Sequence, residues 1–342
     1  MVYTKIVDAV RAAIIEEMDA DPNVVTLGED IGVFGGAYRV TEGLLEKYGE
    51  SRVRDTPISE AAIAGAAIGA AMTGLRPVAE FQFNDFMACA MDQICNQAAK
   101  IRLMMGGQVK VPLVFRAPYG ATGRAAQHSQ SLEAWFAHTP GLKVVMPSTP
   151  YDAKGLMVSA IRDDNPVVFL EHKMLYGAAS PGGKARTAVG NLSEAFRPAP
   201  EGPYSIEIGK ADVKREGGDV TVVATGFMVH KAISAADALL KEGVACEIID
   251  PRSVSPLDMD TILRSLEKTG KLLITTESVG FCGIAAEIAA EAADGGIYSL
   301  DAPVRRVCAK NSPIPFAPAC ESDVLPQEND IIEAALSLCG VR

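Results

Sequence analysis

The chain has no surplus of positive charge and no long apolar run. Its 342 residues carry 32 Lys and Arg against 43 Asp and Glu, a net charge of −11, which argues against nucleic acid or an anionic membrane as the main partner. The longest weakly polar run, residues 61–74, is too short to span a bilayer and is rich in Gly and Ala. Residues 1–5 lack the features of a secretion or transit leader. We therefore expect a cytoplasmic protein.

The chain also lacks paired cysteine motifs. Its seven cysteines are scattered, and no two have the C-x-x-C spacing. This pattern argues against a disulfide framework and against a thiolate zinc site. We expect ordinary reduced cysteines in the core.

Two nucleotide-binding motifs are missing as well. No G-x-G-x-x-G follows a predicted strand, and no Walker loop is present. A glycine-rich loop at residues 28–36 has no lysine and carries Glu29 and Asp30. Because carboxylates repel phosphate, we do not interpret this loop as a phosphate cradle.

The residues that are present indicate an α/β fold. Hydrophobic residues make up 48% and charged residues 22% of the chain, as in a globular protein with a large core. Several β-branched runs are nearly continuous, which is typical of parallel strands buried on both faces. These runs are residues 24–27, 111–115, 144–145, 167–170, 220–225, 246–249, 272–276 and 304–307. Helical patterns at residues 91–105 and 231–242 lie between them, and the first has Met91, Ile94, Cys95 and Ala98 on one stripe.

Residues 196–203 contain three prolines and a glycine, which break regular structure. We place a first domain at 1–195, a linker at 196–205 and a smaller α/β domain at 206–342. We find no internal repeat and no low-complexity tail.

Glu60 is the first candidate for chemistry. It stands alone before an almost uncharged, small-residue segment, and Ser59 is placed to cap the helix that follows. A carboxylate in such surroundings is costly to bury without a partner, which makes Glu60 a candidate acid or base. The alternative is a helix-start carboxylate that only complements the helix dipole.

Residues 80–86 alternate as at the end of a strand, with Phe86 at its exit. Phe86 has the flat face needed to stack on a heterocycle, and Gln82 can orient such a ring by hydrogen bonds. The alternative is ordinary core packing.

His128 lies in a glycine-containing loop after the strand at 111–115. Loops beyond parallel strands are where α/β enzymes place catalytic groups. The alternative is a solvated loop histidine. His138, His172 and His230 lack this context, and we interpret them as structural.

Residues 160–166 form the fourth candidate segment. Backbone carbonyls and short polar side chains at the end of a helix can bind a hard cation. The alternative is a plain turn between a helix and a strand.

Taken together, these motifs resemble a known family. The chain is similar to the beta subunit of thiamine-diphosphate-dependent 2-oxo acid dehydrogenases, the first component of the pyruvate, branched-chain and acetoin complexes. The likeness runs through Thr56-Pro-Ile-Ser-Glu60, Glu80-Phe-Gln-Phe83, Gln127-His-Ser-Gln130, Pro140-Gly-Leu-Lys-Val-Val145, Ile161-Arg-Asp-Asp-Asn165-Pro166 and Asp250-Pro-Arg252, with a looser match at residues 277–283. It covers essentially the whole chain and implies a transketolase-like, doubly wound pyrimidine-binding domain followed by a C-terminal transketolase-like domain.

The resemblance implies a role for each candidate. Glu60 would hydrogen-bond the pyrimidine ring nitrogen of the cofactor and so activate it. Phe86 would pack on the pyrimidine, with Gln82 and Ile58 nearby, and His128 would handle protons on the thiazolium side. A structural potassium ion would be bound mostly through backbone carbonyls, at Leu113, Ala160, Ile161, Asp163 and Asn165.

One half of such a site is missing from the sequence. The Gly-Asp-Gly motif and later Asn that hold the diphosphate through magnesium in this class are absent. An alpha subunit would then bind the diphosphate and Mg²⁺ in an α2β2 heterotetramer, and the second domain would serve assembly with the dihydrolipoyl acyltransferase core.

The implied reaction is decarboxylation of a 2-oxo acid and acyl transfer to lipoamide, by an oxidoreductase that is active with its alpha subunit. We rank pyruvate first, acetoin cleavage second and branched-chain substrates third. Two further alternatives are a non-catalytic assembly subunit and a self-sufficient transketolase-like enzyme.

Overall fold

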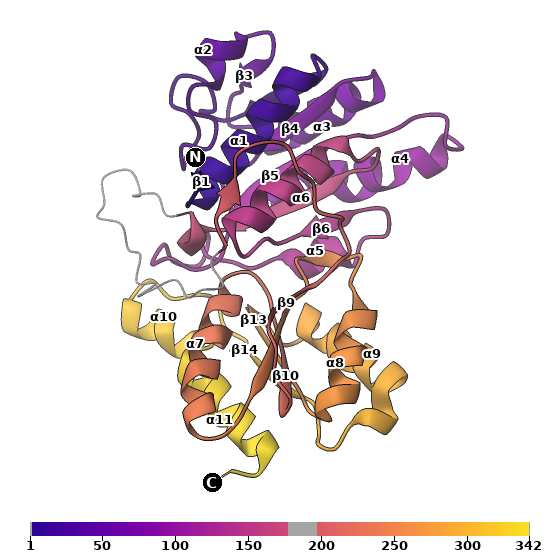
Figure 1. Ribbon diagram of the computed structural model, residues 1–342. Coiled ribbons are helices and arrows are strands. Elements are labelled where there is room, and N and C mark those ends of the chain that lie inside the picture. Colours follow the sequence, from indigo (N-terminus) through magenta and orange to yellow (C-terminus); the bar gives the residue numbers. More distant parts are fainter. Residues whose placement is uncertain (1, 177–196, 342) are drawn as a thin grey trace.

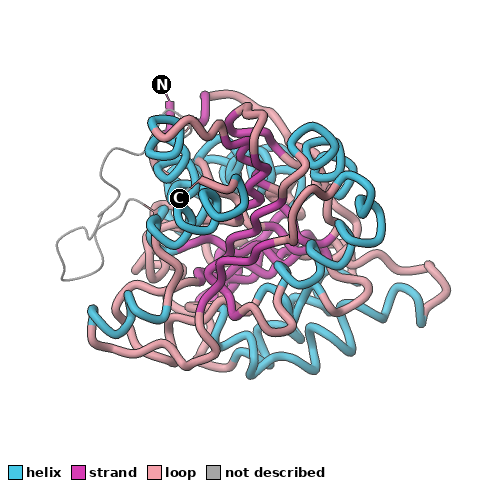
Figure 2. The backbone as a smooth tube through the Cα atoms, turned by 90° about the horizontal axis from the view of Figure 1, so that it is seen from below, coloured by secondary structure: helices cyan, strands magenta, loops and turns pink. Residues whose placement is uncertain are grey.

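A computed structural model describes residues 2–176 and 197–341, which form two α/β units (Figure 1). The expected domain boundary at residue 195, together with Phe196, lies outside the described residues. Strands run through the middle of the molecule, with helices on both sides (Figure 2). This arrangement agrees with the predicted α/β class and explains the continuous apolar runs, because a strand covered on both faces has no solvent side.

The first unit is built on a seven-stranded sheet with the order β12-β6-β7-β5-β4-β2-β3. All neighbours are parallel except β12 and β6. The strands are β2 (Val24–Gly28), β3 (Val53–Asp55), β4 (Arg76–Glu80), β5 (Val114–Tyr119), β6 (Lys143–Val145), β7 (Val167–His172) and β12 (Ser253–Ser255). Strand β12 comes from the range we assigned to the C-terminal domain, so that segment contributes a strand to the N-terminal sheet.

Helices cover both faces of this sheet. On one face α1 (Ile6–Ala20) packs on α6 (Pro150–Arg162). On the other lie α3 (Glu60–Met72), a 3-10 helix (Asn84–Ala90), a π-helix (Asp92–Ala98) and α4 (Ala99–Met104). Ile94 and Ala98 are buried, with Met91 and Cys95 packed beside them, as the predicted stripe requires. Short helices α2 (Leu44–Tyr48) and α5 (Glu133–Ala137) complete the unit.

The second unit has a five-stranded sheet with the order β14-β13-β10-β11-β9, in which only β9 is antiparallel. Its strands are β9 (Asp212–Arg215), β10 (Val220–Ala224), β11 (Cys246–Asp250), β13 (Leu272–Val279) and β14 (Arg305–Ala309). Helices α7 (Phe227–Lys241) and α11 (Glu328–Cys339) lie on one side of the sheet, and α8 (Met259–Thr269) and α9 (Ile284–Gly296) on the other (Figure 1). Helix α10 (Pro318–Val324) lies near the first unit (Figure 1).

Three local expectations were wrong. The linker contains a regular element, because β8 (Ala199–Pro200) pairs with β1 (Val2–Tyr3); a two-residue edge strand tolerates proline. Strand β4 ends at Glu80, and Phe86 lies in the 3-10 helix that follows rather than at a strand exit. All seven cysteines are free; Cys246 is buried and Cys95, Cys308 and Cys339 pack against core clusters, but Cys89, Cys282 and Cys320 are exposed and are not core residues.

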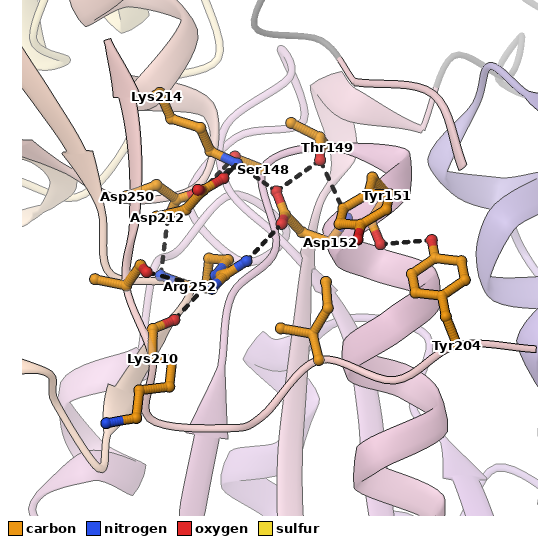
Figure 3. Close-up of polar contacts among 12 residues, drawn as sticks. Ser148, Thr149, Tyr151, Asp152, Tyr204, Lys210, Asp212, Lys214, Asp250 and Arg252 are labelled. Carbon is orange, nitrogen blue, oxygen red and sulfur yellow. Dashed lines mark hydrogen bonds and ion pairs between the residues drawn. The ribbon is translucent and has the colours of Figure 1, made fainter. Parts of the chain in front are cut away.

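A buried polar cluster joins the two units (Figure 3). We call Ser148, Asp152, Lys214, Asp250 and Arg252 the domain junction. Lys214 Nζ lies 2.5 Å from Asp152 Oδ2 and 3.7 Å from Asp250 Oδ2, and Arg252 Nη1 lies 3.2 Å from Asp152 Oδ1. Ser148 donates to Asp250. Each charge has a partner from the other unit or from its own, which a buried charge requires.

The helices give no sign of a membrane-spanning segment. Within residues 2–176 and 197–341, none has the length and apolar character needed to cross a bilayer.

Candidate functional site

The predicted site residues gather at one edge of the seven-stranded sheet. Strands β2, β4, β5 and β7 are parallel, so the segments that follow them emerge on the same side. Doubly wound sheets bind ligands beyond these carboxyl ends. We call the set found there the carboxyl edge; its members are Glu29, Asp30, Glu60, Gln82, Phe86 and His128.

Glu60 is the first residue of α3 and is half-buried. Ser59 occupies the N-cap position, but its side chain makes no capping hydrogen bond, so the expected cap is wrong. Burial raises the pKa of Glu29, and the negative charges of Glu60 and Asp30 raise it further. Glu60 and Asp30 therefore both lie near Glu29, and the three residues form a carboxylate cluster.

Gln82 is tied to the same cluster. Its Nε2 donates to Asp30 Oδ2 at 3.4 Å. The segment before α3 is fixed on β2, because Thr56 N donates to Gly28 O at 2.9 Å. Ile58 in that segment is 83% exposed, which leaves an apolar side chain open to contact with another molecule.

Phe86 and His128 lie in direct contact. Their ring centroids are 5.4 Å apart at 83°, and Phe83 packs edge-on to both rings, at 5.7 Å and 5.1 Å. His128 is half-buried. Although they are 42 positions apart in the sequence, the two predicted residues thus form one aromatic cluster with Phe83.

Lys173 holds the loop that carries His128, and sequence reasoning missed it. It follows β7, is 6% exposed, and its Nζ donates to the backbone carbonyl of His128. Burial lowers the pKa of Lys173 to about 8, although nearby Asp85 and Glu277 favour the charged form. Its position directly after a predicted parallel strand is the sequence signal that could have identified Lys173.

The histidines that we took as structural differ from one another. His172 is buried, and its Nε2 lies 3.0 Å from Glu277 Oε2, on β13 of the second unit. His230 Nε2 lies 2.7 Å from Ser148 O, and burial lowers the pKa of His230 to about 4. His138 is exposed. The two buried histidines join the two units.

A buried charged network joins the strands whose ends form the carboxyl edge. Arg116 on β5 lies between Glu80 at the end of β4 and Glu171 on β7, and its Nη2 donates to Tyr176 Oη at 3.1 Å. Burial raises the pKa of Glu80, which Arg116 partly opposes. Two carboxylates share one guanidinium, so the network fixes the ends of three adjacent strands.

The predicted metal residues also lie together. Ala160 and Ile161 end α6, Leu113 precedes β5, and all three are buried. Two of the expected ligand carbonyls, those of Ile161 and Asp163, accept hydrogen bonds from Arg76 Nη1 at 3.0 and 3.2 Å. The Asp163 and Asn165 side chains bind each other at 2.9 Å. A guanidinium already supplies positive charge at this turn.

The carboxyl edge has a definite chemical character. Three carboxylates and the Gln82 amide lie at the same end of the sheet as the phenylalanine ring of Phe86 and the imidazole of His128. This set fits a flat heterocycle that offers ring or amine N–H donors. It does not fit a diphosphate, because like charges repel.

Comparison with protein families accounts for both units. The family profile described as transketolase, pyrimidine binding domain, matches residues 4–178, and the one described as transketolase, C-terminal domain, matches residues 209–331. A solved structure titled split gene transketolase, inactive beta4 tetramer, is similar with a TM-score of 0.77 over 98% of both chains at 21% identity. At that identity the likeness shows the fold alone.

Curated relatives are much closer in sequence. The chain is 47% identical over 338 residues to the beta subunit of acetoin:2,6-dichlorophenolindophenol oxidoreductase of Cupriavidus necator, covering 96% of this chain and 95% of that one. It is 46% identical to the pyruvate dehydrogenase E1 component subunit beta of Bacillus subtilis, covering 98% of each. It is also 46% identical to the 2-oxoisovalerate dehydrogenase subunit beta of Bacillus subtilis, covering 96% of each.

Proposed function

This chain belongs to the family of E1 beta subunits of pyruvate, acetoin and branched-chain 2-oxo acid dehydrogenases, and we propose that it is the thiamine-diphosphate-binding beta subunit of a heterotetrameric enzyme of that kind. The observation that carries the proposal is the carboxyl edge, where Glu60, Gln82, Phe86 and His128 gather although they come from three separate segments.

The chemistry of the carboxyl edge supports a shared cofactor. Glu60, Glu29 and Asp30 suit the aminopyrimidine of thiamine diphosphate, whose N–H groups need acceptors. The same carboxylates would repel its diphosphate. We therefore assign the diphosphate and Mg²⁺ to an alpha subunit, with the cofactor lying between the two chains.

Each residue then has one task. Glu60 shares its proton with the pyrimidine ring nitrogen, Phe86 packs against that ring, and Gln82 and Ile58 border it. When bound, thiamine diphosphate supplies the carbon nucleophile that attacks the substrate carbonyl. His128 moves protons on the reacting side during substrate binding and transfer to the lipoyl group.

The proposed reaction is oxidative decarboxylation of pyruvate with acyl transfer to lipoamide of a dihydrolipoyl acyltransferase core. Cleavage of acetoin, with the same transfer, is the second candidate. Identities of 47% to the acetoin relative and 46% to the pyruvate and 2-oxoisovalerate relatives do not separate the substrates.

A structural potassium ion at residues 113 and 160–165 stays a proposal. Buried carbonyls at the end of α6 support it. The hydrogen bonds from Arg76 to two of those carbonyls argue the other way, since an ion there would share its ligands with a guanidinium.

The test is reconstitution with the alpha-type subunit encoded by the neighbouring gene, followed by activity assays with pyruvate, acetoin and branched 2-oxo acids. We expect cofactor-dependent turnover and lipoamide acylation only when both chains are present, and cofactor affinity to be weak for this chain alone. Tight binding of Mg²⁺ and thiamine diphosphate by the isolated chain would support a self-sufficient transketolase-like enzyme instead. Absence of turnover with every substrate, in a complex that binds the cofactor, would support a non-catalytic assembly subunit.

A further inference from the structure

A hydrogen bond joins the two ends of the loop that carries His128, and residues of the first unit hold its C-terminal end. We call residues 120–130 the His128 loop. Gly120 N donates to Gln130 O at 3.1 Å. Asp85 Oδ1 accepts from Gln130 N at 3.1 Å and from Gln130 Nε2 at 2.9 Å. Lys173 donates to the backbone carbonyl of His128, so the first unit holds the C-terminal end of the loop, and the start of the loop is held separately.

That start is fixed by the second unit. Ala121 N donates to Glu277 Oε1 at 2.6 Å, and Glu277 is 8% exposed on β13. A second carboxylate, Glu321 on α10, accepts from Gly123 N at 2.8 and 3.1 Å. The C-terminal domain, which we expected to serve assembly, thus binds two amides of the His128 loop.

His172 fixes the orientation of the Glu277 carboxylate. Met174 N donates to His172 Nδ1 at 3.2 Å, so Nε2 carries the imidazole proton and donates to Glu277 Oε2 at 3.0 Å. Burial opposes ionisation, but His172 and the Ala121 amide hold the pKa of Glu277 below its usual value. Both carboxylate oxygens are used.

The packing around His172 leaves little room for movement. Its ring is stacked on Phe227 at 5.1 Å and 20°, and lies edge-on to Tyr119 at 4.9 Å. Gly120 has φ +88°, and a Cβ there would overlap His172 Nε2. The His128 loop therefore begins in direct contact with the imidazole, and only glycine fits at that point.

We propose that Glu277 is a positioning residue for His128: from the second unit it fixes the start of the His128 loop and so sets where the imidazole lies against Phe86. The proposal rests on the proposed function, because His128 must act in the reaction for its position to matter. A misplacement of about 1 Å costs up to roughly a hundredfold in rate.

The experiment is a double-mutant cycle in the reconstituted complex with Glu277→Ala, His128→Ala and the double variant. We expect Glu277→Ala to lower kcat about 10- to 100-fold, and to cost less than about twofold when His128 is already absent, because residues that act as a unit are not additive. Hydrogen exchange at the amides of residues 121–128 should become about tenfold faster as one anchoring bond is lost.

Two further variants are needed: Glu277→Gln as the conservative substitution and Glu247→Ala as the control. The glutamine keeps an acceptor for the Ala121 amide, so it should recover part of kcat and most of the loop's protection, and it serves if the alanine variant does not fold. Glu247 is another buried carboxylate of the second unit, and it pairs with Lys268. Its removal should lower stability but leave kcat and exchange in the His128 loop unchanged.

Three results would overturn the proposal. These are an equal loss from Glu277→Ala with and without His128, unchanged exchange in the His128 loop, or the same loop response to Glu247→Ala. Full activity of His128→Ala would instead refute the proposed role of His128, and the exchange measurement would still report whether Glu277 anchors the loop.

Discussion

The domain junction and the carboxyl edge differ in how their carboxylates are paired. At the junction Asp152 and Asp250 are fully buried, and each has partners within the chain. At the carboxyl edge Glu60 is half-buried and Ile58 is 83% exposed, and three carboxylates lie near one another. The junction carboxylates have their cations within the chain, whereas Glu29, Asp30 and Glu60 form a cluster of like charge, as we propose for a site that binds a ligand.

The comparison is sharpest at Glu60. We predict that Glu60→Gln lowers kcat of the complex by about 10²- to 10⁴-fold, the range lost with a positioned acid or base. The folding free energy should change by no more than about 1 kcal/mol, because the side chain stays half-exposed and the lost interaction with the helix dipole is partly offset by weaker repulsion of Glu29. Steady-state kinetics and urea denaturation measure the two effects.

Glu328 provides the matched control, since it is also the first residue of a helix, α11. Glu328→Gln should cost about 0.3–1 kcal/mol of stability and no activity. If Glu60→Gln behaved in the same way, Glu60 would be a helix-start carboxylate and nothing more.

At the domain junction the expected loss is in stability. Lys214→Met leaves Asp152 and Asp250 buried without their shared cation, which should cost about 3–5 kcal/mol. The midpoint of urea denaturation is the measurement. Lys47→Met, at an exposed ion pair with Asp19, should cost about 1 kcal/mol or less. Equal losses at Lys47 and Lys214 would show that the junction is no better matched than the surface.

Lys173 is buried like the residues of the domain junction but lies next to the carboxyl edge, and its contribution to the free energy of unfolding depends on pH. Burial lowers its pKa to about 8 from 10.5. Between pH 8 and pH 10.5 the unfolded chain holds a proton that the folded chain has lost, so stability should rise with pH by up to about 1.4 kcal/mol per pH unit. Below pH 8 both states are protonated, and this contribution no longer changes.

Unfolding free energies of the wild type and of Lys173→Met at pH 8, 9 and 10 isolate this group. The difference between the two proteins should shift with pH in the stated direction. A constant difference would show that Lys173 stays charged in the folded protein throughout this range.

The sequence predicts most of the central strands, because continuous apolar runs such as 220–225 and 167–170 mark strands buried on both faces. Short strands such as β3 and β12 have no such run and were missed. Gln82, Phe86 and His128 could be proposed from the sequence because they lie in segments that follow predicted strands. The pair His172–Glu277 spans 105 positions, and no local pattern reports which distant strands end side by side.

Strand β12 has a consequence for how the chain is made. Residues 253–255 pair with β6 and complete the first sheet, although about fifty residues of the second unit separate them from the linker at 196–205. Until that strand emerges during synthesis, β6 is an open edge with unpaired backbone groups, the kind of surface on which chains aggregate. The two units are therefore interlocked, and a cut in the linker would yield two incomplete fragments.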